Sequence, residues 1–304
     1  MATPRISVIT PSYNQARFLE RAICSVLDQG YQSLEYLIAD GGSDDGSAEL
    51  IRMYEDELAW SCSQPDAGPV DAINRCLDHA TGDLVLILNA NDVLLPGALD
   101  RVAAAFAGPD APAWVSGRCL RMDGRDETLG QFTASAPESL VSFLKHDSGM
   151  LPGPSTVYRR DVLEAAGRLA PEMRDAYRYE LSCRLLVLGH QPGVLKTTIA
   201  GTRETDPGPT AEQTLRRGEA YIDVAERHAQ ALPMGERYVL WKNCNERRRI
   251  YALASAETKL SAARRHLWQQ LLRRPWWLAS DAYRRMLLHG VAQTSSDHTS
   301  RKAA

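Results

Sequence analysis

The sequence predicts an α/β protein with a mixed, mainly parallel sheet flanked by helices, and three observations along its 304 residues support that fold class. Short apolar runs alternate with helical segments over residues 1–106, as in right-handed βαβ units. The alternation loosens over 107–210, and 211–304 is almost wholly helix-forming. We therefore expect two halves of one α/β domain, 1–106 and 107–210, and a helical C-terminal extension, 211–304, with a disordered end after residue 292.

Each element of the first half follows from the spacing of its apolar residues. Runs of branched apolar side chains predict strands at 6–9, 34–39, 58–63 and 84–88. Apolar stripes at helical spacing predict helices at 18–30, 47–54, 70–80 and 96–106. Ser47 is expected to cap the second of these helices through its hydroxyl.

The second half is less regular, and its elements are shorter. Apolar runs predict strands at 114–117, 118–122, 155–158 and 194–199. Helical spacing predicts helices at 137–145, from 160 onward, and at 179–188. A loop with two prolines and a glycine, Glu204 to Thr210, is the expected boundary of the domain.

Composition limits the partners and the compartment of the protein. With 44% hydrophobic and 24% charged residues, the chain can bury a large core. The formal charge of -3 is uneven, because the first 100 residues are acidic and the tail carries arginine pairs from Arg247 to Arg285, which favours an anionic surface as neighbour. We expect no nucleic-acid partner.

Cysteine usage and hydropathy indicate a cytoplasmic protein. The six cysteines are scattered without a C-x-x-C pair, so reduced thiols are expected rather than a zinc site or disulfides. No signal-peptide architecture precedes Ile6, and no window approaches 18 continuous apolar residues.

The segment from Leu88 to Asp92 is a candidate metal and diphosphate site. Polar side chains directly after a buried strand lie at its carboxyl end, where open α/β sheets bind ligands. Asp92 is the one full charge there, with Asn89 and Asn91 beside it. A carboxylate suits Mg²⁺ or Mn²⁺ bridging two phosphates, because these cations prefer hard oxygen ligands. The alternative is an ordinary Asn/Asp turn.

Three other predicted strand ends carry residues suited to a nucleotide. Tyr13 follows the first strand with Thr10 and Pro11, and its ring could stack on a base. Asp40 ends the second strand and could accept from the N–H edge of a nucleobase, while Gly41 lets a ligand approach the backbone. The third strand end and the helix after it supply Asp66, Asp71 and Asn74. Each alone fits a turn or cap, but together at one sheet edge they predict a nucleotide site.

These segments resemble the family 2 glycosyltransferases of the bacterial cell-envelope type. The similar motifs are S-V-I-T-P-S-Y-N-Q (7–15), D-G-G-S-D-D-G-S (40–47), P-D-A-G-P-V-D-A-I-N (65–74), A-T-G-D (80–83) and L-N-A-N-D-V-L-L-P-G-A-L (88–99). The resemblance implies a GT-A fold, a nucleotide-sugar donor with Mn²⁺ or Mg²⁺, and inversion at the anomeric carbon. It implies nucleobase and ribose contacts from Thr10, Pro11, Tyr13 and Asp40. It also places Asp66 and Asp71 beside the nucleotide and donor sugar, and Asp92 at the metal.

The chain departs from that family pattern at three places. Asn91 stands where the family has the first of two adjacent acids, and the segment after Arg203 lacks the histidine often found there. Arg178 stands where the family has its aspartate base, and a guanidinium is always protonated, so it cannot take a proton from the acceptor.

Two carboxylates are candidates to replace the missing base. Asp175, three positions before Arg178, would lie about one turn away on a similar face if the helix extends that far, and we favour it. Glu180 would be rotated by roughly 200°. For Arg178 itself we favour a surface ion pair with Glu172 or Asp175 over a contact with the diphosphate leaving group.

The tail segment 264–285 mixes leucines and tryptophans with paired arginines. Packing of this apolar stripe on the domain or on a partner subunit is the favoured interpretation, because such stripes are usually core. The alternative is a peripheral contact with an anionic membrane, at the inner face of the cell membrane.

The leading hypothesis is an inverting glycosyltransferase that moves a sugar from a nucleotide diphosphate donor, with a UDP-sugar favoured, to a hydroxyl of a glycan or lipid-linked sugar in envelope or polysaccharide synthesis. The alternatives are a catalytically silent nucleotide-sugar-binding or scaffold protein and a nucleotidyltransferase. The last is disfavoured because no basic glycine-rich loop follows the first strand.

Overall fold

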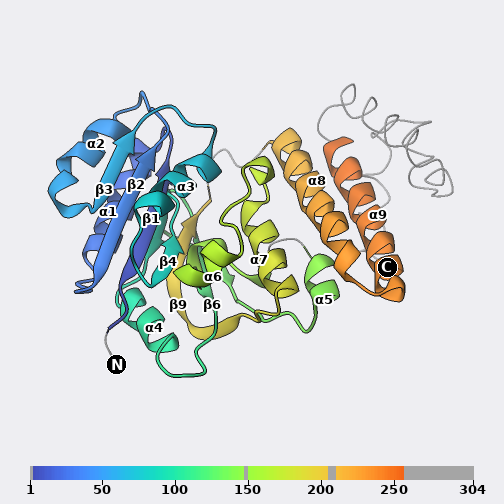
Figure 1. Ribbon diagram of the computed structural model, residues 1–304. Helices are drawn as coiled ribbons and strands as arrows, with labels where there is room; N and C mark the ends of the chain where they lie inside the picture. Colours follow the sequence, from blue (N-terminus) through green and yellow to red (C-terminus); the bar gives the residue numbers. More distant parts are fainter. Residues whose placement is uncertain (1–2, 147–149, 205–209, 257–304) are drawn as a thin grey trace, which may run out of the picture.

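The computed structural model describes residues 3–146, 150–204 and 210–256, which form three layers with helices on both faces of one sheet (Figure 1). Nine strands of the described chain make this sheet, in the order β3-β2-β1-β4-β8-β6-β9-β5, with β7 paired to β6. The strands are β1 Ile6–Ser12, β2 Leu34–Asp40, β3 Trp60–Ser63, β4 Leu84–Ile87, β5 Asp92–Leu94, β6 Trp114–Met122, β7 Thr128–Phe132, β8 Thr156–Arg159 and β9 Gly193–Arg203. The helices are α1 Ala16–Leu27, α2 Ser47–Met53, α3 Pro69–His79, α4 Ala98–Ala105, α5 Leu140–Leu144, α6 Arg160–Ala165, α7 Tyr177–Val187, α8 Ala211–His228 and α9 Met234–Ala256.

Strand direction divides the sheet into a parallel part and a mixed part. β3, β2, β1 and β4 are parallel, so their carboxyl ends share one edge. β8 is antiparallel to both β4 and β6, while β9 is parallel to β6 and antiparallel to β5. The predicted α/β class, with a mixed sheet between helices, is confirmed.

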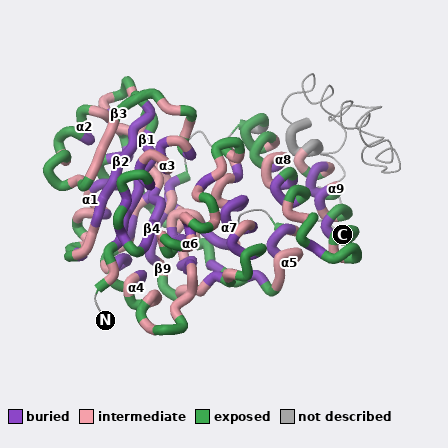
Figure 2. Tube along the Cα trace, in the orientation of Figure 1, coloured by how far each residue is buried: buried purple, intermediate pink, exposed green. Residues whose placement is uncertain are grey.

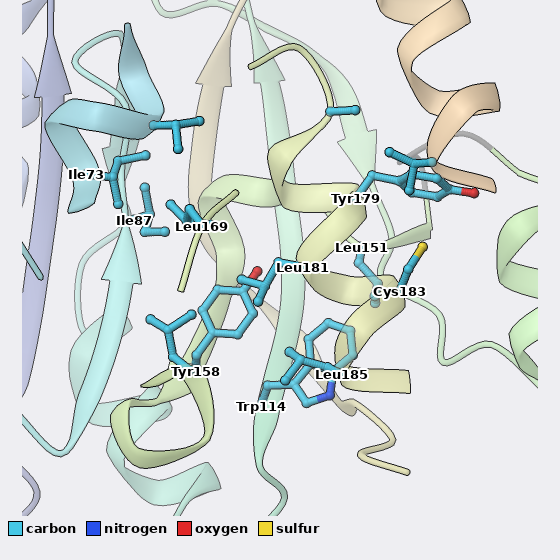
Figure 3. Close-up of a cluster of buried hydrophobic side chains, with 14 of the residues drawn as sticks. Ile73, Ile87, Trp114, Leu151, Tyr158, Leu169, Tyr179, Leu181, Cys183 and Leu185 are labelled. Carbon is cyan, nitrogen blue, oxygen red and sulfur yellow. The ribbon is translucent and has the colours of Figure 1, made fainter. Parts of the chain in front are cut away.

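Alternation of side chains along the strands builds one core on each face of the sheet. Leu84 and Leu86 of β4 join the core that packs against α1, α2 and α4, whereas Val85 and Ile87 join the core against α3, α6 and α7. Figure 2 shows the buried strands between the two helical layers. Figure 3 shows the second core, where Tyr158 and Trp114 of the sheet lie close to Leu181 and Leu185 of α7.

Helix α8 packs beside α7, α9 packs against α8 and α5, and both extend the second core (Figure 1). The Tyr179 ring stacks on Phe143 at 5.1 Å between centroids and meets Tyr221 edge-on at 5.3 Å. Two of the basic tail residues are used inside this packing: Arg247 donates to Leu144 O at 3.1 Å, and Arg248 pairs with Glu226 and Asp223. The segment 264–285 and the residues after 292 lie outside the described chain, so the predictions for them are not tested.

Several local expectations were wrong or incomplete. Ser47 is the first residue of α2 rather than its cap, and its hydroxyl donates to Asp45 Oδ1 at 2.6 Å. The residue before it, Gly46, has φ +97°, which favours glycine at the start of this helix. The two strands expected at 114–122 form one strand, with register shifts on both sides of Arg118. β5 and β7 were not expected.

All six cysteines are free, in agreement with the prediction of reduced thiols. Of the helices within 3–146, 150–204 and 210–256, none combines the length and hydropathy needed to span a bilayer.

Candidate functional site

Asp40 organises the loop at the end of β2. Its buried carboxylate accepts from the backbone N–H groups of Gly42 at 3.2 Å and Ser43 at 2.9 Å, and from the hydroxyls of Ser43 at 2.5 Å and Ser63 at 2.8 Å. Four donors on one carboxylate hold the chain in a turn around it. The Asp40 carboxylate therefore shapes the loop in which it is predicted to bind a nucleobase.

Gly41 lets the strand ends of β2 and β3 approach each other. A Cβ added to Gly41 would lie 2.9 Å from Asp66 Oδ2, closer than such contacts occur. Asp66 in turn accepts from the Gly68 N–H at 2.7 Å, just before α3 begins. The absence of a side chain at Gly41 thus makes room for the Asp66 carboxylate. The sequence suggested that this glycine serves the approach of a ligand to the backbone, whereas the structure explains it by the approach of Asp66.

A cavity of about 590 Å³ lies where these strand ends meet, and we call it the strand-end cavity. Its lining residues are Pro11, Ser12, Tyr13, Gly41, Gly42, Pro65, Asp66, Gly68, Pro69, Ala72 and Arg174. The Tyr13 ring, 62% exposed, is free to stack on a planar ligand. The structure therefore brings together Pro11, Tyr13, Gly41 and Asp66, as the sequence predicts, and adds Arg174.

Asp40 and three other residues predicted to contact the nucleotide lie outside the lining of this cavity. Thr10 is fully buried and its hydroxyl bonds to Tyr36 Oη at 3.0 Å. Asp71 pairs with Arg75 at 2.9 Å, and the Asn74 amide donates to Leu169 O at 2.9 Å. These contacts give each of them a structural role, and their direct contact with a nucleotide stays a prediction.

A second cavity of about 570 Å³ lies at the start of α7, and we call it the α7 cavity. It is lined by Pro69, Asn89, Phe132, Leu151, Pro152, Gly153, Pro154, Arg174, Asp175, Ala176, Tyr177, Arg178, Tyr179, Thr202, Arg217 and Tyr221. Pro69 and Arg174 line both cavities, so the two are neighbours. Because its walls combine aromatic rings with charged side chains, this cavity is suited to a sugar-like ligand.

Asp175 is the single carboxylate among the residues that line the α7 cavity. Its Oδ2 lies 2.8 Å from Arg216 Nε of α8, in an ion pair that keeps the carboxylate in one orientation. α7 begins at Tyr177, so the helix does not extend back to Asp175 as the sequence argument required. Asp175 and Arg178 nevertheless line the same cavity.

Arg178 is not in a surface ion pair, and that interpretation was wrong. Glu172 and Asp175 pair with Arg227 and Arg216 of α8 instead. The Arg178 guanidinium points toward the end of β4, where it donates to Ile87 O at 3.3 Å, Gly153 O at 3.0 Å and Asn89 Oδ1 at 3.2 Å.

Glu180 lies on another face of α7, as its rotation along the helix predicts. Its buried carboxylate pairs with Arg184 at 2.7 Å and lies 3.5 Å from His228 Nε2. Burial raises the pKa of Glu180, but hydrogen bonds from His228 and Arg184 outweigh burial and lower it overall. Glu180 lines neither cavity, so its place argues against a role as base.

Asp92 is linked to Arg178 through Asn89. Asp92 begins β5, opposite Thr202 of β9, and is completely buried. Its Oδ2 accepts from Asn89 Nδ2 at 2.7 Å, and Asn89 Oδ1 accepts from Arg178. Burial raises the pKa of Asp92, and a hydrogen bond with Thr202, the Arg178 charge and hydrogen bonds with Asn89 oppose this only in part.

These residues do not fit a divalent cation. Asp92 Oδ1 has no hydrogen-bond partner in the described chain, which leaves one oxygen for a metal. However, the carboxylate is completely buried and has a guanidinium for a neighbour, and the Asn91 amide donates to Arg203 O at 3.3 Å. Within the described ranges, no group of three His, Cys, Asp or Glu side chains could hold a metal.

Sequence reasoning missed Arg174 and the role of Arg203. Arg203 is buried at the end of β9, where it pairs with Asp126, donates to Asn91 O at 3.0 Å and lies 5.4 Å from the Phe18 ring centroid. No motif spacing relates Asp126 or Asn91 to Arg203, because the contacts depend on how β9 pairs with β5 and with β6, the strand before the turn that carries Asp126.

Curated proteins similar to this chain are glycosyltransferases. The sequence profile described as Glycosyl transferase family 2 matches residues 7–167. An uncharacterized glycosyltransferase of Nostoc sp. is 34% identical over 176 residues, 55% of this chain and 54% of that protein. The GalNAc(5)-diNAcBac-PP-undecaprenol beta-1,3-glucosyltransferase of Campylobacter jejuni is 32% identical over 121 residues, 38% of each chain. The chain thus spans about half the length of the first relative and less of the second.

Solved structures share the fold. The S. aureus TarS fragment 1-349 in complex with UDP-GlcNAc has a TM-score of 0.58 at 15% identity, over 83% of this chain and 90% of that one. The mannosyltransferase PcManGT from Pyrobaculum calidifontis, in complex with GDP-Man and Mn²⁺, has a TM-score of 0.60 at 20% identity, over 94% and 84%. The GT-A fold implied by the resemblance is confirmed by these neighbours. With a profile match over more than half of its length and a fold that agrees, this protein belongs to glycosyl transferase family 2.

Proposed function

We propose that the protein transfers a sugar, with inversion, from a nucleotide diphosphate donor to a hydroxyl of a glycan or lipid-linked acceptor in envelope or polysaccharide synthesis. The observation that carries this proposal is the pair of neighbouring cavities, one at the strand ends and one containing Asp175. A UDP-sugar is the favoured donor, and the structural neighbours solved with UDP-GlcNAc and with GDP-Man make UDP- and GDP-sugars the donors to test. The similarity to the Campylobacter jejuni glucosyltransferase, whose name includes an undecaprenol-linked glycan, supports a lipid-linked acceptor. A lipid-linked acceptor lies in a membrane, so we propose that the reaction takes place in the cytoplasm, at the inner face of the cell membrane.

In this proposal the donor nucleotide occupies the strand-end cavity and the acceptor the α7 cavity. Asp175 takes the proton from the acceptor hydroxyl, whose oxygen bonds to the anomeric carbon while the bond to the diphosphate oxygen breaks on the opposite side. The ion pair with Arg216 holds the Asp175 carboxylate in one orientation. No step is assigned to the cation predicted at Asp92, because its surroundings do not fit one.

The test of Asp175 is transfer activity after removal of its charge. Purified protein is incubated with a panel of UDP- and GDP-sugars, and nucleotide release is measured with and without acceptor glycans. Asp175→Asn should lower the rate by about 10²- to 10⁴-fold, the range for loss of a general base, with donor affinity unchanged. Glu172→Gln, which removes a neighbouring acid in a 3.4 Å pair with Arg227, is the matched control and should keep its activity. An active Asp175→Asn variant would exclude this base.

A catalytically silent nucleotide-sugar-binding protein is the second candidate. The observation that favours it is Arg178, an arginine with its donors committed to Ile87, Gly153 and Asn89 where the family resemblance places the base. This candidate predicts donor binding that Asp40→Ala abolishes, with no turnover on any acceptor. Transfer that Asp175→Asn removes would rule it out.

A further inference from the structure

We propose that the Arg174 guanidinium, rather than a divalent cation, supplies the positive charge that holds the donor diphosphate in this chain. The inference rests on the proposed function, since it concerns the donor of the same site. It follows from three observations: the position of Arg174, the free donors of its guanidinium, and the position of the Arg178 cation next to Asp92.

Arg174 lies where the two cavities meet. It lines both of them, together with Pro69 at the first turn of α3. Its guanidinium lies against Gly68, where an added Cβ would be 2.6 Å from Nη2, and the φ of +116° at Gly68 also favours glycine. The bare backbone at Gly68 therefore lets the guanidinium reach the place between nucleotide and acceptor, where a donor diphosphate would lie.

The donors of Arg174 are available for a ligand. Its side chain is exposed, and no described residue forms a hydrogen bond or ion pair with it. Three neighbouring arginines are committed: Arg75 pairs with Asp71, Arg216 with Asp175, and Arg178 donates to main-chain oxygens. Arg217 of α8 lines the α7 cavity but not the strand-end cavity, so Arg174 is the arginine that lines both with its donors free. A planar guanidinium binds two phosphate oxygens at once, so Arg174 can hold a diphosphate bidentately.

The charges around the strand-end cavity favour such a cation. Asp66 is the single carboxylate among the residues that line it, and it would repel a diphosphate. Arg174 offsets that repulsion, because its side chain and that of Asp66 both lie at Gly68. Asp66 Oδ1 accepts from the Gly68 N–H, and the Arg174 guanidinium lies against the Gly68 Cα.

The Asp92 region cannot supply that charge through a metal. Asp92 is completely buried, and the cationic Arg178 lies next to it through Asn89. A divalent ion there would meet a positive charge already in place and a single carboxylate oxygen free of hydrogen bonds among the described residues. The diphosphate therefore relies on an arginine from the segment before α7.

The test is calorimetric binding of UDP and GDP, with uridine and guanosine as probes that lack the diphosphate. Titrations use the full chain in EDTA and again in MnCl₂. We expect the nucleoside diphosphate to bind in EDTA, with Mn²⁺ changing Kd less than about threefold. Arg174→Ala should weaken diphosphate binding by about tenfold or more, as for loss of one charge-assisted pair, and leave nucleoside binding unchanged. Arg174→Lys should recover part of the loss.

Arg227→Ala is the matched control, because it removes an exposed arginine of α8 whose ion pair with Glu172 lies outside both cavity linings. Its Kd should equal that of the parent protein. Binding that requires Mn²⁺, or an Arg174→Ala variant with unchanged Kd for the diphosphate, would overturn the inference while leaving the proposed transferase intact. If a folded parent protein binds neither diphosphate in either buffer, the proposed function itself fails.

Discussion

Glu35 shows how one buried acid joins three segments of the first half of the chain. Its carboxylate accepts from the Ser7 hydroxyl, from the Thr81 N–H and hydroxyl at 2.8 Å each, and pairs with Arg5 at 3.0 Å. Burial raises the pKa of Glu35, but these donors and the Arg5 charge outweigh burial and lower it below its ordinary value of 4.5. β1, β2 and the turn before β4 thus share one charged centre.

A pH-dependent contribution to stability follows from this centre. Since the folded pKa of Glu35 is depressed, its contribution is complete above about pH 4.5 and is lost as pH falls through the folded pKa. Glu35→Gln should therefore lower the free energy of unfolding by about 1–3 kcal/mol near pH 7, the cost of breaking a buried charged hydrogen bond. Urea titrations from pH 7 to pH 3 should show the difference from the parent protein shrinking.

The control for this prediction is Glu49→Gln, because Glu49 is an exposed acid in a surface pair with Arg52. Exposed pairs contribute little, so its stability should stay within about 0.5 kcal/mol of the parent at every pH. A Glu35→Gln deficit that is the same at pH 7 and pH 3 would contradict the role assigned to the charge.

At the scale of elements, α8 and α9 pack closely at one glycine. A Cβ added to Gly218 of α8 would lie 2.6 Å from the Tyr251 ring of α9. The glycine costs helix propensity, yet it allows the ring to lie against the helix backbone. Contact between the two long helices therefore depends on a residue that is unfavourable within α8 alone.

Gly218→Ala should destabilise the protein although alanine is the better helix former. Overpacking costs about 1–3 kcal/mol and exceeds the propensity gain of about 1 kcal/mol, so we expect a net loss of up to about 2 kcal/mol in chemical denaturation followed by circular dichroism. Gly235→Ala in α9 is the matched control, since an added Cβ there meets nothing within 4 Å. Its stability should be equal or slightly higher. A Gly218→Ala protein that is more stable than the parent would contradict this prediction, because it would mean that α8 and α9 move apart to fit the added methyl group without loss of stability.

The elements also show which local structures a sequence can predict. Long runs such as 34–39 were placed within a residue or two, because both faces of a central parallel strand are apolar. β5 was missed because it is three residues long and pairs with β9 far along the chain, and β7 was missed because its five residues are mostly exposed and form no apolar run. The strand predicted to end at Leu88 therefore gave no sign that Asp92 begins another strand.

The same distinction between local sequence pattern and long-range packing applies to the residues of the candidate site. Tyr13, Gly41 and Asp66 could be predicted to share a site, because the carboxyl ends of parallel strands meet at one edge. Arg174 and the contacts of Arg178 could not, because they depend on how the segment before α7 packs across the sheet ends. Periodicity places a residue on a face of its own helix but does not reveal what packs against that face.

On the scale of the whole molecule, one core joins both halves of the sheet to the described part of the C-terminal extension. Ile9 of β1, Leu181 of α7, Ile222 of α8 and Leu240 of α9 all belong to it. None of these parts can unfold without exposing apolar surface of the others. The proposed division at 106 and 210 therefore describes positions in the chain rather than separately folding units.

Thermal unfolding of the protein should accordingly be a single transition. We expect one endotherm in scanning calorimetry, with calorimetric and van't Hoff enthalpies in agreement, because the shared core makes unfolding cooperative. Far-ultraviolet circular dichroism and tryptophan fluorescence should give the same midpoint. Two resolved endotherms would mean that α8 and α9, or one half of the sheet, form an independent unit.

The Asn89 amide has a consequence for how this site could change by mutation. Its oxygen accepts from the Arg178 cation and its nitrogen donates to the Asp92 carboxylate, so a neutral amide lies between the two charges in one fixed orientation. An acid introduced at 89 alone would bring two carboxylates together, and an acid introduced at 178 alone would leave Asp92 without its compensating cation. The two positions are therefore expected to be epistatic: a change to an acidic, cation-binding centre would pass through a destabilised single variant.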